Sequence, residues 1–162
     1  MTHPQAVAIQ VRRLRSSDQE LARQLFAMMA TVFGEPGEPL SDVYLDRLLN
    51  CEEFWAVVAL ESGEVVGGLT AYALRLTRAE TEELFVYDVA VRADRQRRGV
   101  GRALWGTLRA EASAAGVGVM FVPAETADVH ALEFYRALGG APTRVTMFTF
   151  ATGAEQSQIA PR

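Results

Sequence analysis

The chain has 162 residues, a formal net charge of −4, and apolar and charged fractions typical of a single globular domain. No uncharged apolar run approaches the roughly 18 residues of a membrane-spanning helix, and residues 1–10 lack the pattern of a signal peptide. We therefore expect a cytoplasmic protein without membrane contact. The single cysteine, Cys51, excludes an intrachain disulfide, and His3 and His130 are too isolated for a metal site.

The first third of the chain predicts one strand and two helices. Residues 7–14 alternate in polarity, as a strand does. Ser17, with Glu20 three residues later, fits a capping box for a helix whose core side chains follow at helical spacing. A loop with two prolines and two glycines spans residues 34–39, and a second helix begins at Ser41 or Asp42 and ends near Asn50.

The remainder predicts three consecutive strands (54–60, 65–76 and 84–91), a helix (100–115), a strand (117–122), a helix (128–138) and a last strand (144–150). The order β-α-α-β-β-β-α-β-α-β predicts an α/β (α+β) fold, with a mixed central sheet flanked by helices. We expect one domain over residues 1–151 and a disordered tail over residues 152–162.

Residues 96–101, with the sequence QRRGVG, form a glycine-containing turn between a strand and a helix. The first N–H groups of a helix have no internal partner, and glycine lets a ligand come close to the backbone. This turn therefore predicts a phosphate or pyrophosphate site. Five arginines lie between residues 92 and 102 and add charge that suits polyphosphate, although a solvated, arginine-rich helix start would look the same.

The spacing Q-x-x-G-x-G resembles the pyrophosphate loop of the GNAT acetyltransferases, which use acetyl-CoA, and the order of elements is also theirs over about residues 7–150. In that family the strand before the loop splays from its neighbour and its backbone holds the pantetheine arm. The resemblance implies that an N–H near Val89 polarises the thioester carbonyl. It implies these contacts with the coenzyme: Val89, Ala90, Val91, Gln96, Arg97, Arg98, Gly99, Val100, Gly101 and Arg102.

Tyr135 lies in a segment that resembles the family motif x-F-Y-x-x-x-G, whose tyrosine protonates the departing thiolate of coenzyme A. A phenol with a pKa near ~10 is a suitable acid for a thiolate of similar basicity. The alternative is a half-buried tyrosine whose hydroxyl contacts water.

Asp88 is a carboxylate within an otherwise apolar strand. Burial without a partner is costly, so we expect it to face a cleft, where it could bind an amine or act as general base. Regular alternation places Asp88 on the face opposite to Glu83, Phe85 and Tyr87 unless a bulge intervenes. The alternative is an ion pair with an arginine such as Arg75 or Arg92.

The run Tyr87-Asp88-Val89-Ala90-Val91, preceded by Glu83, resembles the aminoglycoside 3-N-acetyltransferase type I family. Phe33-Gly34-Glu35 and the Tyr44 segment resemble that family as well. The resemblance implies Asp88, Glu83 and Tyr135 as catalytic residues. It implies an acceptor site formed by Glu35, Tyr87, Asp88, Glu125 and Asp128, although residues 124–128 are less acidic than in the family.

An aminoglycoside is a polycation, and residues 35–64 carry eight acids and one base. The function predicted by the resemblance is therefore acetylation of an aminoglycoside amine, at the 3-amino group, with resistance as the consequence. Two alternatives stay open: a GNAT enzyme for a polyamine, another small amine or a protein N-terminus, and an acyl-CoA-binding module without turnover. The local basic residues do not predict a nucleic-acid surface. Homodimers are common in this family, and the edge of the meander or the last strand could pair.

Overall fold

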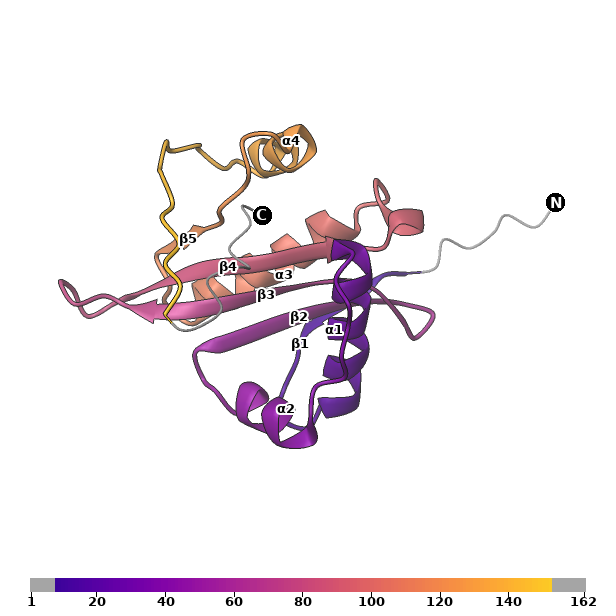
Figure 1. Cartoon of the computed structure of the whole chain (residues 1–162). Coiled ribbons are helices and arrows are strands. Elements are labelled where there is room, and N and C mark those ends of the chain that lie inside the picture. Colours follow the sequence, from indigo (N-terminus) through magenta and orange to yellow (C-terminus); the bar gives the residue numbers. More distant parts are fainter. Residues whose placement is uncertain (1–7, 153–162) are drawn as a thin grey trace. The chain divides into compact units, whose positions relative to one another are not determined.

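The computed structural model describes residues 8–152 (Figure 1). The chain forms two compact units, Met1–Pro123 and Ala124–Arg162. The first contains β1 (Gln10–Arg13), α1 (Gln19–Phe33), α2 (Asp42–Leu49), β2 (Phe54–Glu61), β3 (Glu64–Arg75), β4 (Glu82–Val91), the short 3₁₀ helix η1 (Ala93–Arg95), α3 (Val100–Ala114) and β5 (Val119–Phe121). The second contains α4 (Val129–Ala137). Within residues 8–152, no helix has the length and apolar character needed to cross a membrane.

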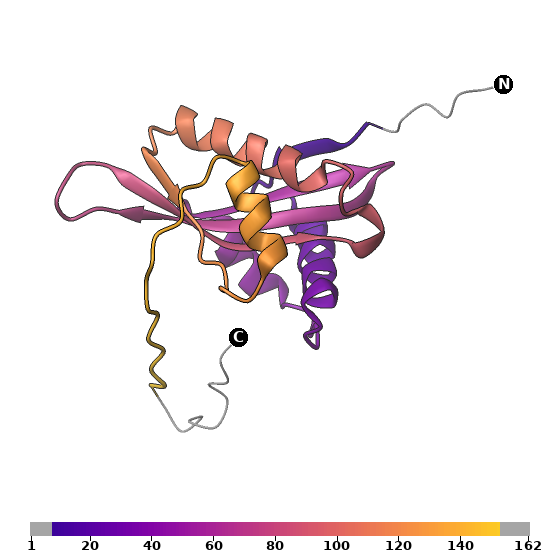
Figure 2. The same ribbon diagram turned by 90° about the horizontal axis from the view of Figure 1, so that it is seen from above.

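The five strands form one mixed sheet in the order β1-β2-β3-β4-β5. The first four make an antiparallel meander, and β5 runs parallel to β4. Helices α1 and α2 cover one face and α3 covers the other, as the two views show together (Figures 1 and 2). The predicted fold class, a mixed sheet flanked by helices, is confirmed.

Two adjacent glycines of β3 allow helices to approach the sheet on both faces. Successive strand residues point to opposite faces. A Cβ at Gly67 would lie 2.8 Å from Val100 Cγ1 of α3. At Gly68 it would overlap Leu25 Cδ1 of α1 and lie 2.9 Å from the carbonyl oxygen of Val57. The pair of glycines therefore fixes how closely α1 and α3 pack on the sheet that carries the site.

Replacing Gly68 with alanine is expected to destabilise the protein by about 2 kcal/mol, because the added methyl group has no space in the core. This corresponds to a fall in Tm of about 4–8 °C in a thermal unfolding scan. Gly106 is the matched control: it lies within α3, and a Cβ there would meet nothing within 4 Å. Gly106→Ala should raise stability by about 0.5–1 kcal/mol. Equal Tm values for the two variants would contradict the close packing at Gly68.

The start of α1 differs from the prediction. The N-cap residue is Asp18, not Ser17, and the capping box is not formed. The Asp18 carboxylate instead accepts hydrogen bonds from the Arg12 guanidinium at 2.7 and 2.8 Å and from the Arg15 N–H at 2.7 Å. The arginine beside it lowers the pKa of Asp18. This carboxylate therefore joins β1 to the start of α1.

Residues 144–150 form no strand in the structure, so the last strand of the predicted order is absent. Alternating apolar residues favour a strand, but a strand is stable only when an edge pairs with it. Large apolar side chains of this segment are instead 69–81% exposed: Val145, Met147, Phe148 and Phe150. Apart from Thr152, the predicted tail lies outside the described residues.

Candidate active site

The loop between β4 and α3 has two residues in the left-handed region, Arg97 at φ 57° and Gly99 at φ 86°. Left-handed residues in such a turn direct successive N–H groups into one concavity, an arrangement that binds anions. Gly99 is the N-cap of α3 and supplies no capping side chain. A Cβ at Gly99 would meet nothing within 4 Å, so the space in front of the backbone is open. The loop fits a pyrophosphate group.

The five arginines around this loop divide into two groups. Arg92 pairs with Asp94 at 2.8 Å and Glu64 at 3.4 Å, and Arg95 pairs with Asp94 at 2.7 Å and with Glu61. These two side chains attach the start of the loop to the β2–β3 hairpin. The other three are exposed and make no ion pair with any residue in the described part of the chain: Arg97, Arg98 and Arg102. Three arginines, not five, are therefore available to a polyphosphate.

Next to this loop, the outer edge of β4 has no paired strand among residues 8–152. The ladder between β4 and β5 ends at Phe85, opposite Phe121. The Arg92 N–H donates to the Val66 carbonyl oxygen at 3.0 Å, so the backbone N–H and C=O groups of Arg92 face β3. Because such groups alternate along a strand, the backbone groups of Val89 and Val91 face this outer edge. Gln96 Nε2 donates to the Val91 carbonyl at 3.2 Å. The Val89 N–H therefore points to the side of β4 that has no paired strand beyond Phe85 among the described residues.

Ala90 differs from its two neighbours. It pairs with Gly68 in β3, and its side chain is 2% exposed in the core. By the same alternation its backbone groups face β3. The geometry therefore supports contacts of Val89 and Val91 with an acyl-CoA arm but gives none to Ala90.

A β-bulge in β4 sets the direction of Asp88. Thr70 pairs with Asp88 and the next β3 residue, Ala71, pairs with Val86, which leaves Tyr87 without a partner in β3. A bulge of this kind changes the alternation by one residue. Regular alternation, as expected from the sequence, would place Asp88 and Glu83 on opposite faces of the sheet. The bulge brings both residues to the same face.

Directly opposed residues of an antiparallel pair share a face of the sheet. Gly68 of β3 faces α1, and every second residue of β3 shares its face. The β4 residues that pair with these positions therefore lie on the α1 face as well. The opposed pairs on this face are Leu74 with Glu83, Tyr72 with Phe85, Thr70 with Asp88, and Gly68 with Ala90. Glu83 and Asp88 share this face but lie about 13 Å apart, four residues along β3. One amine cannot contact both.

Asp88 is half-buried and accepts a hydrogen bond from the Thr70 hydroxyl, with Oγ1 and Oδ2 at 3.3 Å. The two arginines considered as its ion-pair partners are engaged elsewhere. Arg75 pairs with Glu53 at 2.9 Å and Glu82 at 3.3 Å, and Arg92 pairs as described above. This hydrogen bond from a neutral hydroxyl orients the carboxylate.

Aromatic side chains near Asp88 form a row across the same face. Consecutive ring centroids lie 5.2–6.3 Å apart, in the order Phe26, Phe54, Tyr72, Tyr87, Phe85 and Phe121. The sequence interpretation missed Thr70 and Tyr72. Their alternation in β3 places them on one face, but only the register with β4 brings them to Asp88.

Tyr135 lies on α4 in the second unit, where it is half-buried and packs against Phe134 with ring centroids 5.2 Å apart. Burial, with Asp128 adding to it, raises the pKa of Tyr135 to about 12. The Asp128 carboxylate caps α4 by accepting from the Ala131 N–H at 2.9 Å. Glu125 and His130 are exposed in the same unit. Glu35 is exposed after α1, in the first unit.

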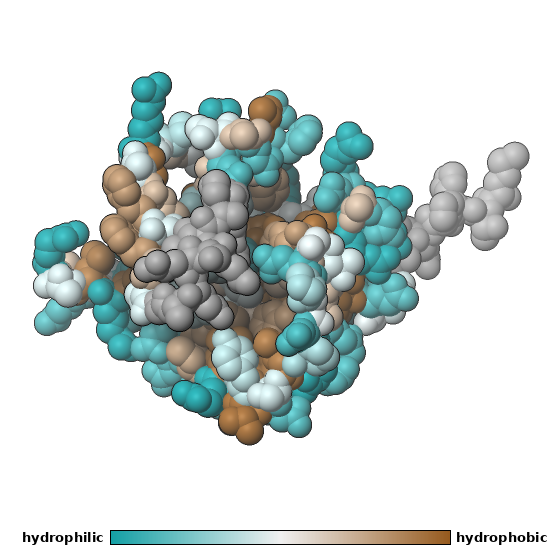
Figure 3. All heavy atoms as spheres, in the orientation of Figure 1, coloured by the Kyte–Doolittle hydropathy of each residue, from teal (hydrophilic) through white to brown (hydrophobic). Residues whose placement is uncertain are grey.

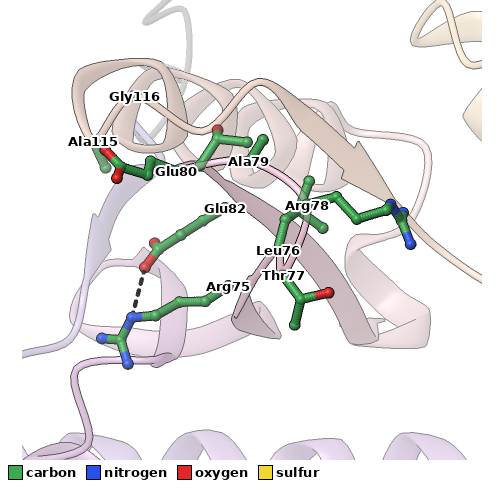
Figure 4. Close-up of a pocket in the computed structure, with 10 residues that line it drawn as sticks. Arg75, Leu76, Thr77, Arg78, Ala79, Glu80, Glu82, Ala115 and Gly116 are labelled. Atoms are coloured by element: carbon green, nitrogen blue, oxygen red, sulfur yellow. Dashed lines mark ion pairs between the residues drawn. The ribbon is translucent and has the colours of Figure 1, made fainter.

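The structure also has an open cavity of about 770 Å³ at the β3–β4 turn and the end of α3 (Figure 4). It lies at the start of β4, about 30 Å along the strand from the 96–101 loop. Arg75 and Glu82, which form an ion pair, contribute to its wall. None of the residues expected in the acetyl transfer site lines this cavity. Within the described residues, no group of three His, Cys, Asp or Glu could hold a metal ion.

A loop that suits a polyphosphate, at the end of a strand whose outer edge is unpaired, is the arrangement expected of an acyl-CoA-dependent transferase. The chain belongs to the acetyltransferase (GNAT) family, whose model matches residues 19–139. It is therefore an N-acetyltransferase that uses acetyl-CoA.

Among solved structures, the chain is 34% identical to the aminoglycoside acetyltransferase HMB0005 from an uncultured soil metagenomic sample, with a TM-score of 0.86 and coverage of 90% of this chain and 99% of that one. It is 31% identical to the aminoglycoside acetyltransferase meta-AAC0020, also from an uncultured soil metagenomic sample and solved with sisomicin, with a TM-score of 0.85 and coverage of 90% and 97%. Aminoglycoside N-acetyltransferase AAC(6')-Iy in complex with CoA, 16% identical over 94% of this chain and 100% of that one, shares the fold with a TM-score of 0.76. No curated protein sequence matches the chain.

Replacing Gly99 with valine is expected to raise the KM for acetyl-CoA about tenfold or more, because a side chain would fill the open space before the loop backbone. A left-handed φ is itself unfavourable for valine, so the control must carry the same strain. Gly116, at φ 79° beyond the far end of α3 and also with open space at its Cβ, meets this condition. Gly116→Val should leave the KM unchanged in a thiol-release assay. An equal rise for both variants would show that strain, not loss of the anion site, is responsible.

Proposed function

We propose that this protein acetylates an amine of an aminoglycoside, at the 3-amino group, with acetyl-CoA as donor, and so confers resistance. The observation that carries this proposal is the bulge in β4, which presents Tyr87 and Asp88 on the face of α1 beside the open end of the strand. A carboxylate next to an aromatic ring suits an ammonium group attached to a sugar ring. Two relatives at 31% and 34% identity are aminoglycoside acetyltransferases, and the first was solved with sisomicin.

In the proposed mechanism each residue acts at a stated atom. When bound, acetyl-CoA supplies an electrophilic thioester carbon and a thiolate leaving group. The N–H groups at residues 99–102 and the side chains of Arg97, Arg98 and Arg102 hold the pyrophosphate. The backbone of Val89 and Val91 holds the arm, and the Val89 N–H donates to the carbonyl oxygen.

The acceptor amine reacts only as a neutral group, so its ammonium form must lose a proton. The Asp88 carboxylate binds that ammonium and takes the proton, while Thr70 orients the carboxylate. Tyr135 donates its hydroxyl proton to the departing sulfur. Burial, with Asp128 adding to it, raises the pKa of Tyr135 to about 12, so the hydroxyl keeps its proton at neutral pH but is a weaker acid than a free phenol. Glu35, Glu83 and Glu125 add negative potential for the other ammonium groups of a polycation, and Asp128, which caps α4, adds to it.

A thiol-release assay with acetyl-CoA and a panel of gentamicin, sisomicin, kanamycin, spermidine and a small peptide tests this function. We expect rapid release with gentamicin and sisomicin, and mass spectrometry and NMR of the product should place one acetyl group on the 3-amino nitrogen. Release with spermidine or the peptide alone would agree with N-acetyltransferase activity but would reject an aminoglycoside as the substrate. Acetylation at a different nitrogen would reject only the regiospecificity.

A further inference from the structure

We propose that Tyr44 and Tyr72 form, together with Tyr87, an aromatic wall that binds the ring of the acceptor and makes the enzyme prefer cyclic aminosugars to linear polyamines. The inference rests on the acceptor site proposed at Asp88 and extends it to two residues on other elements. Tyr72 lies in β3 and Tyr44 in the first turn of α2, whereas Tyr87 and Asp88 lie in β4.

Tyr72 occupies the centre of this wall. Its ring packs between those of Phe54, at 5.3 Å, and Tyr87, at 6.2 Å. Two residues before it in the same strand, Thr70 donates a hydrogen bond to Asp88. Burial raises the pKa of the Tyr72 hydroxyl, and the nearby Tyr44, Tyr87, Cys51 and Asp88 raise it further. The hydroxyl is therefore a neutral donor close to the carboxylate proposed to hold the amine.

Tyr44 and Tyr87 are both more than half exposed, and both lie near enough to Tyr72 to raise the pKa of its hydroxyl. Tyr87 is 53% exposed, and its ring stands nearly perpendicular to both Tyr72, at 81°, and Phe85, at 86°. Tyr44 is 54% exposed, and α2, which carries it, covers this same face of the sheet. On the hydropathy scale of Figure 3 tyrosines are near white, and the view shows pale surface among brown and teal patches on this side of the molecule. The rings of Tyr72 and Tyr87 are in edge contact, and such a pair is a preformed apolar surface.

The chemistry of this surface distinguishes two amines of similar charge. Both a linear polyamine and an aminosugar satisfy the acidic residues, since each carries several ammonium groups. Only a ring offers the flat C–H face that packs on a tyrosine ring, together with hydroxyl groups that the tyrosine hydroxyls can bind. Charge thus attracts the acceptor, and the tyrosines select its shape.

The test compares kcat/KM for sisomicin and for spermidine in the thiol-release assay. Tyr44→Ala should lower the value for sisomicin about tenfold, because one stacked ring is lost, and leave that for spermidine almost unchanged. Val43→Ala is the matched control, since Val43 precedes Tyr44 in α2 and is 70% exposed. Tyr72→Phe keeps the ring packed on Phe54 and removes only the hydroxyl. We expect a smaller fall in kcat/KM, again for sisomicin alone.

The outcomes separate this inference from the proposed function. Turnover of sisomicin that is the same in the wild type, Tyr44→Ala and Tyr72→Phe would reject the aromatic wall and keep the aminoglycoside function. Equal losses for sisomicin and spermidine would also reject it, because the wall would then not distinguish a ring. Wild-type turnover of spermidine alone would overturn both the wall and the proposed function.

Discussion

Replacing Tyr135 with phenylalanine is expected to lower kcat about 100-fold or more, because the variant keeps the ring but loses the proton proposed for the departing thiolate. The ring packs against Phe134 with centroids 5.2 Å apart, and phenylalanine preserves this contact. The KM for acetyl-CoA should change little, since the loop and arm contacts involve other residues. A steady-state thiol-release assay measures both constants.

The pH dependence supplies a second readout. Because the pKa of Tyr135 is raised to about 12, its hydroxyl stays protonated through the working range of the enzyme. Wild-type kcat should therefore show no loss from this residue below about pH 11. The same shift affects stability: the folded pKa lies above the unfolded value near ~10, so the contribution is complete below pH 10 and is lost as the pH rises toward 12.

The control for Tyr135→Phe is coenzyme binding. Calorimetric titration with CoA should give the same Kd for the variant and the wild type, and the two Tm values should agree closely. A kcat within about threefold of wild type would contradict the role of general acid and would favour water as the proton donor.

The elements of the fold were predictable because their signals are local. Apolar spacing, turn residues and the glycine-rich loop each lie within a few consecutive residues, and the predicted sheet and helices from residue 10 to residue 137 are present. The prediction of the last strand was wrong for the same reason, because it too used only a local signal. Residues 144–150 carry the local pattern, but pairing depends on an edge that the pattern cannot describe.

The acceptor face was less predictable because it depends on the bulge. Residues 84–91 read as one continuous apolar run with a single carboxylate, and nothing in that run marks Tyr87 as the extra residue. Only the register with β3 shows that Asp88 lies on the face of Phe85. Likewise, Arg92 and Arg95 pair both with Asp94, inside the arginine cluster, and with Glu64 and Glu61, about thirty residues earlier, so the number of arginines overstated the charge available to a ligand.

Replacing Asp88 with asparagine is expected to lower kcat/KM for the acceptor amine about 100–1000-fold, the range of a lost general base, and to spare the KM for acetyl-CoA. Asparagine has nearly the same shape, and its amide oxygen can still accept the Thr70 hydrogen bond, so the bulge and the fold should persist. The substitution therefore removes the negative charge and the proton acceptor and leaves the shape of the side chain nearly unchanged. The thiol-release assay with a saturating donor measures it.

Glu83→Gln is the matched variant, because it removes a carboxylate from the same face of the same strand about 13 Å from Asp88. At that distance Glu83 can attract a polycation but cannot take a proton from the amine that Asp88 holds. We expect Glu83→Gln to raise the acceptor KM a few-fold, by an amount that fades as salt screens the exposed charges. The loss in Asp88→Asn should persist at high salt. Equal, salt-sensitive losses in both variants would mean that the carboxylates act only by attraction, and the base would then be a water molecule or another residue.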